Sequence, residues 1–140
     1  LHSWFKSYDR KYPHFTMNID GRAIPNGFFS VVLNTNPYTF VGKHPIHLSS
    51  AASLEKKLVV VTFRKMTTPL MLKTLYSALR RGGLETSSGI DIATDVEHVK
   101  IEFPAPFPYQ LDGDYLGDTT SIDIQHCPEA LRLVRPTIDF

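Results

Sequence analysis

The stretch PAPFPYQLDGDYLGDTT, residues 104–120, decides how this chain folds. At its centre, Asp112-Gly113 lies between two short runs, and in the first of them Tyr109 and Leu111 alternate with polar residues. An Asp-Gly pair between such runs is the strongest short-range signal of a β-hairpin, because both central residues of a type I′ turn need positive φ. The stretch therefore predicts two antiparallel strands joined by a tight turn.

A second hairpin with the same turn is predicted near the start of the chain. Phe15, Met17 and Ile19 alternate with polar residues, as in a half-buried strand, and Asp20-Gly21 follows them directly. Residues 23–24 then begin the returning strand. The hairpin signal explains this turn completely, so we expect Asp20 to have a structural role.

Two other runs differ from these because their apolar residues are nearly uninterrupted. Residues 27–34 read GFFSVVLN and residues 58–63 read LVVVTF. Such β-branched and aromatic runs are typical of strands that are buried on both faces. Alternation returns in residues 99–103 and 122–124, and again in residues 131–133. The whole pattern predicts a mainly β protein, built as an antiparallel β-sandwich or barrel.

One or two short helices are expected beside the strands. Residues 1–9 place apolar side chains at helical spacing, which predicts a short helix. A second helix has Thr68 as its N-cap and Pro69 at its first helical position. The residues at 80–82, two arginines and a glycine, suit its end. This helix carries one apolar stripe, of the kind that faces a core: Leu72, Leu75, Tyr76 and Leu79.

Composition limits the function classes. The 140 residues carry a net charge of +1, with basic residues dispersed as short pairs, so there is no electrostatic reason to propose nucleic acid as a partner. The chain has one cysteine, Cys127, which excludes an intramolecular disulfide and favours a cytoplasmic location. We found no internal repeat or linker, so residues 1–140 are interpreted as a single domain.

The other candidate sites have ordinary structural explanations. His44 and His47 flank a proline, and His126 precedes Cys127, but neither pair supplies the three or four converging ligands that zinc needs. We expect no metal site, and we expect Cys127 to be a packed small residue. Residues 34–38, NTNPY, predict a turn in which an Asn side chain bonds nearby backbone. No glycine-rich phosphate loop is present.

Asp112-Gly113-Asp114 allows two interpretations. The turn alone explains it, and from local physics that interpretation is favoured. The functional interpretation is that a carboxylate on a rigid hairpin takes a proton from a substrate hydroxyl. Asp114, with Asp118 close behind, adds negative charge beside Asp112, and such repulsion favours protonation of one member of the group.

Three stretches, taken in order, are similar to a known family. They are FFSVVLNTNPYTFVGKHPIHLSSAASLEKKLVVVTF (28–63), PFPYQLDGDYLG (106–117) and CPEALRLVRP (127–136). This order resembles the C-terminal domain of the bacterial diacylglycerol kinase and sphingosine kinase-like lipid kinases, particularly the actinobacterial kind. That family has a pattern close to Val-Asp-Gly-Glu in a hairpin and later Pro-x-Ala-Leu-Arg-Val, which residues 111–114 and 128–133 match. The resemblance covers essentially the whole chain.

The resemblance implies a β-sandwich that follows an ATP-binding domain in one polypeptide. The lipid, such as diacylglycerol, then meets the phosphoryl donor between the two domains. Asp112 corresponds to the general base for the lipid hydroxyl, and Asp114 to its supporting acid. ATP and Mg²⁺ belong mainly to the N-terminal domain, so we expect no cofactor and no kinase activity in this fragment. A start at Leu1 rather than methionine fits a fragment.

The resemblance also implies binding partners, although the sequence departs from the family pattern at two positions. The expected partners are the nucleotide-binding domain, the lipid, and the inner face of the membrane, which the protein contacts peripherally. A homodimer formed through an edge strand is a further expectation.

Val59 stands where the family has an acid, and Ala51 stands where it has Asp after proline. In the family, that region contributes to a magnesium site or an inter-domain network. The alternative function is therefore a stand-alone β-sandwich module that binds lipid or protein without kinase activity.

Overall fold

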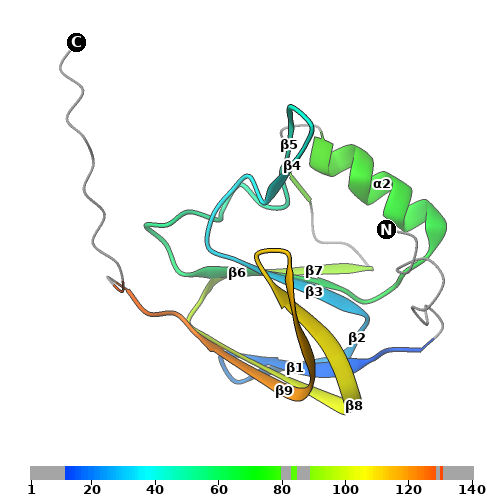
Figure 1. Ribbon diagram of the computed structural model, residues 1–140, viewed down its shortest axis with the longest axis vertical. Helices are drawn as coiled ribbons and strands as arrows, with labels where there is room; N and C mark the ends of the chain where they lie inside the picture. Colours follow the sequence, from blue (N-terminus) through cyan, green and yellow to red (C-terminus); the bar gives the residue numbers. More distant parts are fainter. Residues whose placement is uncertain (1–11, 80–82, 85–88, 129, 131–140) are drawn as a thin grey trace.

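The structure, a computed structural model, describes residues 12–79, 83–84, 89–128 and 130. These residues form antiparallel sheets and one helix (Figure 1). The elements are β1 (Phe15–Ile19), β2 (Arg22–Gly27), β3 (Phe29–Leu33), β4 (Thr39–Val41), β5 (His44–Ile46), β6 (Leu58–Phe63), α2 (Thr68–Leu79), β7 (Ile90–Val96), β8 (His98–Leu111) and β9 (Asp114–Gln125). The predicted mainly β, antiparallel sandwich is confirmed. The expectations for residues 1–9, 80–82 and 131–133 lie outside the described residues.

Two sheets make the sandwich, and α2 adds a layer beside them. The first sheet has the strand order β2-β1-β8-β9, the second has the order β3-β6-β7, and β4 and β5 pair as a separate ribbon. Met17, Val99 and Ile101 from the first sheet pack with Val60 and Val96 from the second in what we call the inter-sheet cluster. Burial of these apolar side chains holds the two sheets together.

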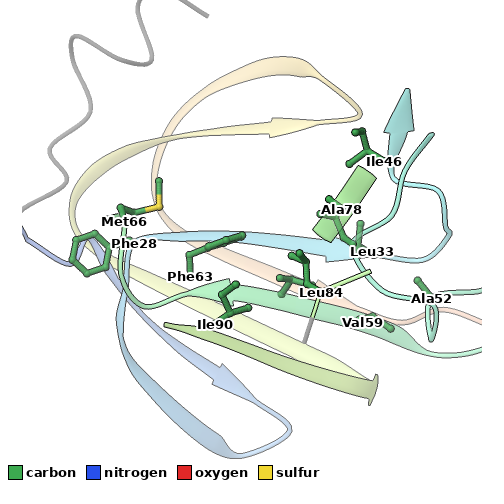
Figure 2. Packing of buried hydrophobic residues seen from close by; sticks show 12 residues of the cluster. Phe28, Leu33, Ile46, Ala52, Val59, Phe63, Met66, Ala78, Leu84 and Ile90 are labelled. Carbon is green, nitrogen blue, oxygen red and sulfur yellow. The ribbon is translucent and has the colours of Figure 1, made fainter. Parts of the chain in front are cut away.

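The central strand β6 contributes to two clusters, which explains its uninterrupted apolar sequence. Val60 belongs to the inter-sheet cluster. Val59, Val61 and Phe63 point to the other face, into a helix-side cluster that also contains Ala78 of α2 (Figure 2). Because successive strand residues face opposite sides, burial of all six β6 residues requires a packed layer on each side. The prediction for residues 58–63 is confirmed.

The prediction for residues 27–34 is only partly right. Phe28 and Leu33 are buried, but residues 29–32 are half-buried. The reason is that β3 pairs only with β6 and lies at the edge of its sheet. A nearly continuous apolar run predicts a strand, but it does not distinguish a central strand from an edge strand.

Helix α2 is confirmed, with two corrections. The Thr67 carbonyl accepts a hydrogen bond from the Met71 N–H (3.0 Å), so Thr67 rather than Thr68 is the N-cap residue. The buried residues of α2 are Thr74 and Ala78, whose small side chains let the helix lie close to the helix-side cluster. The predicted core-facing stripe instead faces outward: Leu72 is 63% exposed, Leu75 52%, Tyr76 61% and Leu79 44%.

No helix in the described residues has the length and apolar character needed to cross a membrane.

Candidate functional site

The predicted hairpin is present, and its turn has the expected geometry. Strands β8 and β9 pair along their length up to Leu111 and Asp114. Between these two residues, Asp112 has φ +51° and Gly113 has φ +94°. Positive φ at both central residues defines a type I′ turn, which suits the right-handed twist of the flanking strands. The backbone therefore fixes the position of Asp112 at the tip of the hairpin.

Prolines bend the hairpin before it reaches this tip. Glu102 pairs with Ser121, but the next pair along β8 is Phe107 with Thr119. Residues 103–106 therefore lie opposite a single residue of β9, and two of the four are prolines, which have no N–H for the ladder. Irregularities of this kind bend a strand and increase its twist. Figure 1 shows β8 and β9 strongly curved.

Aromatic packing against β1 and the residue before it stabilises the bent segment of β8. The Phe103 and Phe107 rings are stacked with centroids 5.1 Å apart. Phe103 also meets Phe15 of β1 edge-on at 5.6 Å, and Phe107 lies 5.0 Å from the His14 ring. These contacts fix the bent segment to β1 and to the residues just before it. The distal part of the hairpin is therefore attached to the sandwich through side chains as well as through the strand ladder.

A second irregularity lies close to the tip. Tyr109 pairs with Gly117 and Gln110 pairs with Tyr115, which leaves residue 116 as an extra residue on β9. Gly117 has φ +110°, a value that glycine adopts without the steric cost of a Cβ. Next to this bulge, the Tyr115 hydroxyl donates a hydrogen bond to Asp118 Oδ1 (2.7 Å). This bond raises the pKa of Tyr115, and burial and the Asp118 charge add to the effect.

The acids of the tip therefore have different surroundings. The Asp118 carboxylate accepts a hydrogen bond from the Tyr115 hydroxyl. Asp112 and Asp114 are exposed, and among the described residues no hydrogen bond or ion pair to their carboxylates is recorded. A solvent-facing carboxylate on a rigid turn is chemically suited to accept a proton from a hydroxyl brought against it. The hairpin supplies positioning, while the hydroxyl and its reaction partner must come from outside this turn.

A hollow among the described residues lies elsewhere. It has a volume of about 560 Å³ and lies at the other end of β8 and β9 from the turn. Two ion pairs involve its lining: Lys57 Nζ lies 2.7 Å from Glu97 Oε1, and His98 Nε2 lies 2.8 Å from Asp123 Oδ1, just beyond the lining. The hydrogen bond to Glu97, with its charge, raises the pKa of Lys57. Sequence reasoning missed this hollow, because its residues come from distant segments.

The other candidate sites from the sequence do not form a functional site in the described residues. The Asn36 side chain contacts the His47 ring (Nδ2 to Nδ1, 3.1 Å) instead of bonding nearby backbone as predicted. Cys127 is exposed, so the expectation that it is packed is wrong; β9 ends at Gln125, before reaching it. In the described residues, no three His, Cys, Asp or Glu side chains converge in an arrangement suited to a metal ion. Of the motif at 128–133, only Pro128 and Ala130 are described.

The two Asp-Gly turns differ in what their carboxylates do. Asp20, with φ +47°, accepts hydrogen bonds from the backbone N–H groups of Glu97 (3.2 Å) and His98 (2.8 Å). This ties the first hairpin to the start of β8, as expected for a structural residue. Asp112 makes no such bond with the described residues, so its carboxylate is not needed to hold the fold.

This difference predicts different effects on stability. We expect Asp20→Asn to lower the free energy of unfolding by about 1 kcal/mol, because two charge-assisted hydrogen bonds are weakened while the residue still tolerates positive φ. Asp112→Asn, in the matching turn, should change it by less than about 0.5 kcal/mol. Urea denaturation of both variants measures the difference, and equal losses would contradict the assigned roles.

Comparison with known proteins supports the fold. A solved structure of a diacylglycerol kinase from Bacillus anthracis str. Sterne superposes with a TM-score of 0.60 at 13% identity, over 87% of this chain and 41% of that one. A second solved structure from the same strain, given the same enzyme class, has a TM-score of 0.60 at 12% identity, over 89% of this chain and 42% of the other. At such identities the likeness shows a shared fold.

This chain therefore spans well under half the length of the two structures it resembles. No family model matches the sequence. No curated protein matches it either.

Proposed function

We propose that this chain is the lipid-substrate domain of an ATP-dependent lipid kinase. In this proposal the domain contributes Asp112 as the general base that takes the proton of a lipid hydroxyl, such as that of diacylglycerol. Asp114, beside it at the tip, adds negative charge that helps to hold the proton. The observation that carries the proposal is an exposed carboxylate on a fixed type I′ turn, in a fold shared with diacylglycerol kinases.

The chemistry matches what phosphoryl transfer asks of a protein. Such transfer depends mainly on positioning and charge stabilisation, with an Asp to orient or deprotonate the attacking hydroxyl. The bent hairpin positions Asp112 through its turn and through the packing of Phe103 and Phe107 below it. When the hydroxyl oxygen attacks phosphorus, its proton passes to the Asp112 carboxylate, and the phosphoryl group leaves its donor.

The described residues hold no cluster of three potential metal ligands. Val59, where the resembling family has an acid, is fully buried in the helix-side cluster. The proposal therefore assigns ATP and Mg²⁺ to a nucleotide-binding domain and to no residue described here. The same domain is the proposed protein partner, and the active protein is proposed to work from the cytoplasm at the inner face of the membrane.

One observation favours the alternative, a binding module without kinase activity. Val59 stands where the family pattern has an acid. Its side chain is fully buried, and the described residues that form the cluster around it are apolar. A module of this kind would bind a lipid or a protein through the same fold without any transfer reaction.

The deciding experiment measures phosphate transfer from radiolabelled ATP to lipid alcohols. The protein should be a polypeptide that joins this domain to a nucleotide-binding domain, tested with diacylglycerol and a sphingoid base in mixed micelles. We expect labelled lipid with at least one of them, and none from the 140-residue chain alone. If the joined protein binds lipid but labels no alcohol, the binding module is the correct function.

A further inference from the structure

The outward face of α2 is apolar, although the helix already has a buried face. Its inward side chains include the buried Thr74 and Ala78 and the partly buried Leu70 and Met71. On the outward side, Leu72, Leu75 and Leu79 are exposed. The outward face of a helix at the surface of a globular domain normally carries polar residues instead. Exposed leucines aligned along one helix face form a contiguous apolar patch, and such patches mark contact with another surface.

The β4–β5 ribbon lies beside α2 and adds exposed apolar side chains. The two elements are joined where the His47 N–H, just after β5, donates a hydrogen bond to the Ala78 carbonyl at the end of α2 (2.8 Å). In the ribbon, Phe40 is 62% exposed and Val41 is 61% exposed, so each face of the ribbon presents an apolar side chain to its surroundings. Figure 1 shows the ribbon standing beside one end of α2. We call Leu72, Leu75, Leu79, Phe40 and Val41 together the helix–ribbon surface.

Three exposed lysines accompany this surface on α2, on the segment before it and on the ribbon. Lys73 lies on α2, Lys65 lies just before it, and Lys43 lies in the turn of the ribbon, and all three are exposed. Between Gly21 and Leu84, the only acidic residue is Glu55. The ribbon (residues 39–46) and α2 (residues 68–79) therefore combine exposed apolar side chains with lysines and contain no acidic residue.

We propose that the helix–ribbon surface docks on an anionic lipid bilayer. Leucine and phenylalanine side chains enter the boundary between headgroups and acyl chains, and the lysines lie against the negative headgroups. Lysine suits this place because its apolar stem lies along the lipid while its ammonium group stays in water. The inference rests on the proposed function for the reason to meet a membrane, since a lipid kinase must reach its substrate there.

The test is co-sedimentation of the 140-residue chain with lipid vesicles. One set contains phosphatidylcholine alone, and the other contains equal parts of phosphatidylcholine and phosphatidylglycerol. We expect binding to the second set, weakened by raised salt because ions screen the lysines. Leu72→Glu should weaken it at least about tenfold, since one leucine leaves the bilayer and a negative charge enters. The matched control is Leu54→Glu, at a leucine that is 70% exposed but lies outside this surface, and it should stay within about twofold.

Several results would overturn the proposal. One is wild-type protein that stays in solution with both vesicle sets, and another is equal binding by the two variants. Concentration-dependent dimers that Leu72→Glu abolishes would assign the surface to a second copy of the chain. Binding that disappears when the nucleotide-binding domain is attached would make it an internal interface. None of these measurements uses the kinase reaction, so their failure is distinct from failure of the lipid-kinase proposal.

Discussion

Replacing Asp112 by Asn in the joined two-domain protein is expected to lower kcat for lipid phosphorylation by about 10²–10⁴-fold. Loss of a positioned general base has an effect of this size, because the amide cannot accept the hydroxyl proton in the transition state. KM for the lipid should change little, since the carboxylate is proposed to act on the reacting hydroxyl and not on the acyl chains. Steady-state kinetics with lipid in mixed micelles measures both parameters.

Two neighbouring acids give graded controls for this prediction. Asp114→Asn should lower kcat less than Asp112→Asn, because Asp114 is proposed to support the charge without receiving the proton. Asp118→Asn changes an acid that already accepts a hydrogen bond from Tyr115, and kcat should stay within a few-fold of the wild type. Near-normal turnover by the Asp112 variant would show that Asp112 is only a turn residue. Because Asp112→Asn is expected to leave stability unchanged, a loss of activity would not reflect unfolding.

Phe63→Ala is expected to cause the largest loss of stability, about 3–5 kcal/mol. Phe63 is 3% exposed, belongs to the helix-side cluster and lies 5.9 Å, centroid to centroid, from the Phe29 ring. Removing a buried aromatic ring loses its transfer free energy and leaves a cavity that the surrounding β-sheet fills only in part. Domains are stable by about 5–15 kcal/mol, so this change removes a large share of the total.

Equilibrium denaturation in urea measures the loss as a lower midpoint with an unchanged slope. The matched control is Leu54→Ala, at a side chain that is 70% exposed, and its effect should lie within about 0.5 kcal/mol. A loss below about 1 kcal/mol in the Phe63 variant would mean that the ring does not fill the space described for it. In that case the packing of α2 against the second sheet would need revision.

The sequence by itself determined the features that depend on neighbouring residues. Asp112-Gly113 specified a type I′ turn because few residues other than Gly, Asn and Asp adopt positive φ. The uninterrupted residues 58–63 specified a strand with an apolar layer on each face. The existence of α2 followed from the threonine and proline before an apolar periodicity. Each of these is decided within a few residues of chain.

The candidate site was predicted only as a position in the chain. The sequence predicted that Asp112 and Asp114 share a hairpin tip, but it did not predict the hydrogen bond from Tyr115 to Asp118. The prolines of residues 104–108 also indicated, within the local sequence, that the hairpin bends. The extent of the bend was decided by contacts with Phe15 and His14, which lie about ninety residues away in the chain.

Only the tertiary structure decided which faces are covered. The periodicity of α2 showed that it has an apolar face. The side that became buried, however, is that of Thr74 and Ala78, with Leu70 and Met71 partly buried, because the ribbon and the second sheet approach the helix from there. Cys127, which lies beyond the end of β9 at Gln125, is exposed. Hydrophobic patterning records which side chains avoid water. It does not record whether the surface that shields them belongs to the same chain, because that depends on contacts between segments far apart in sequence.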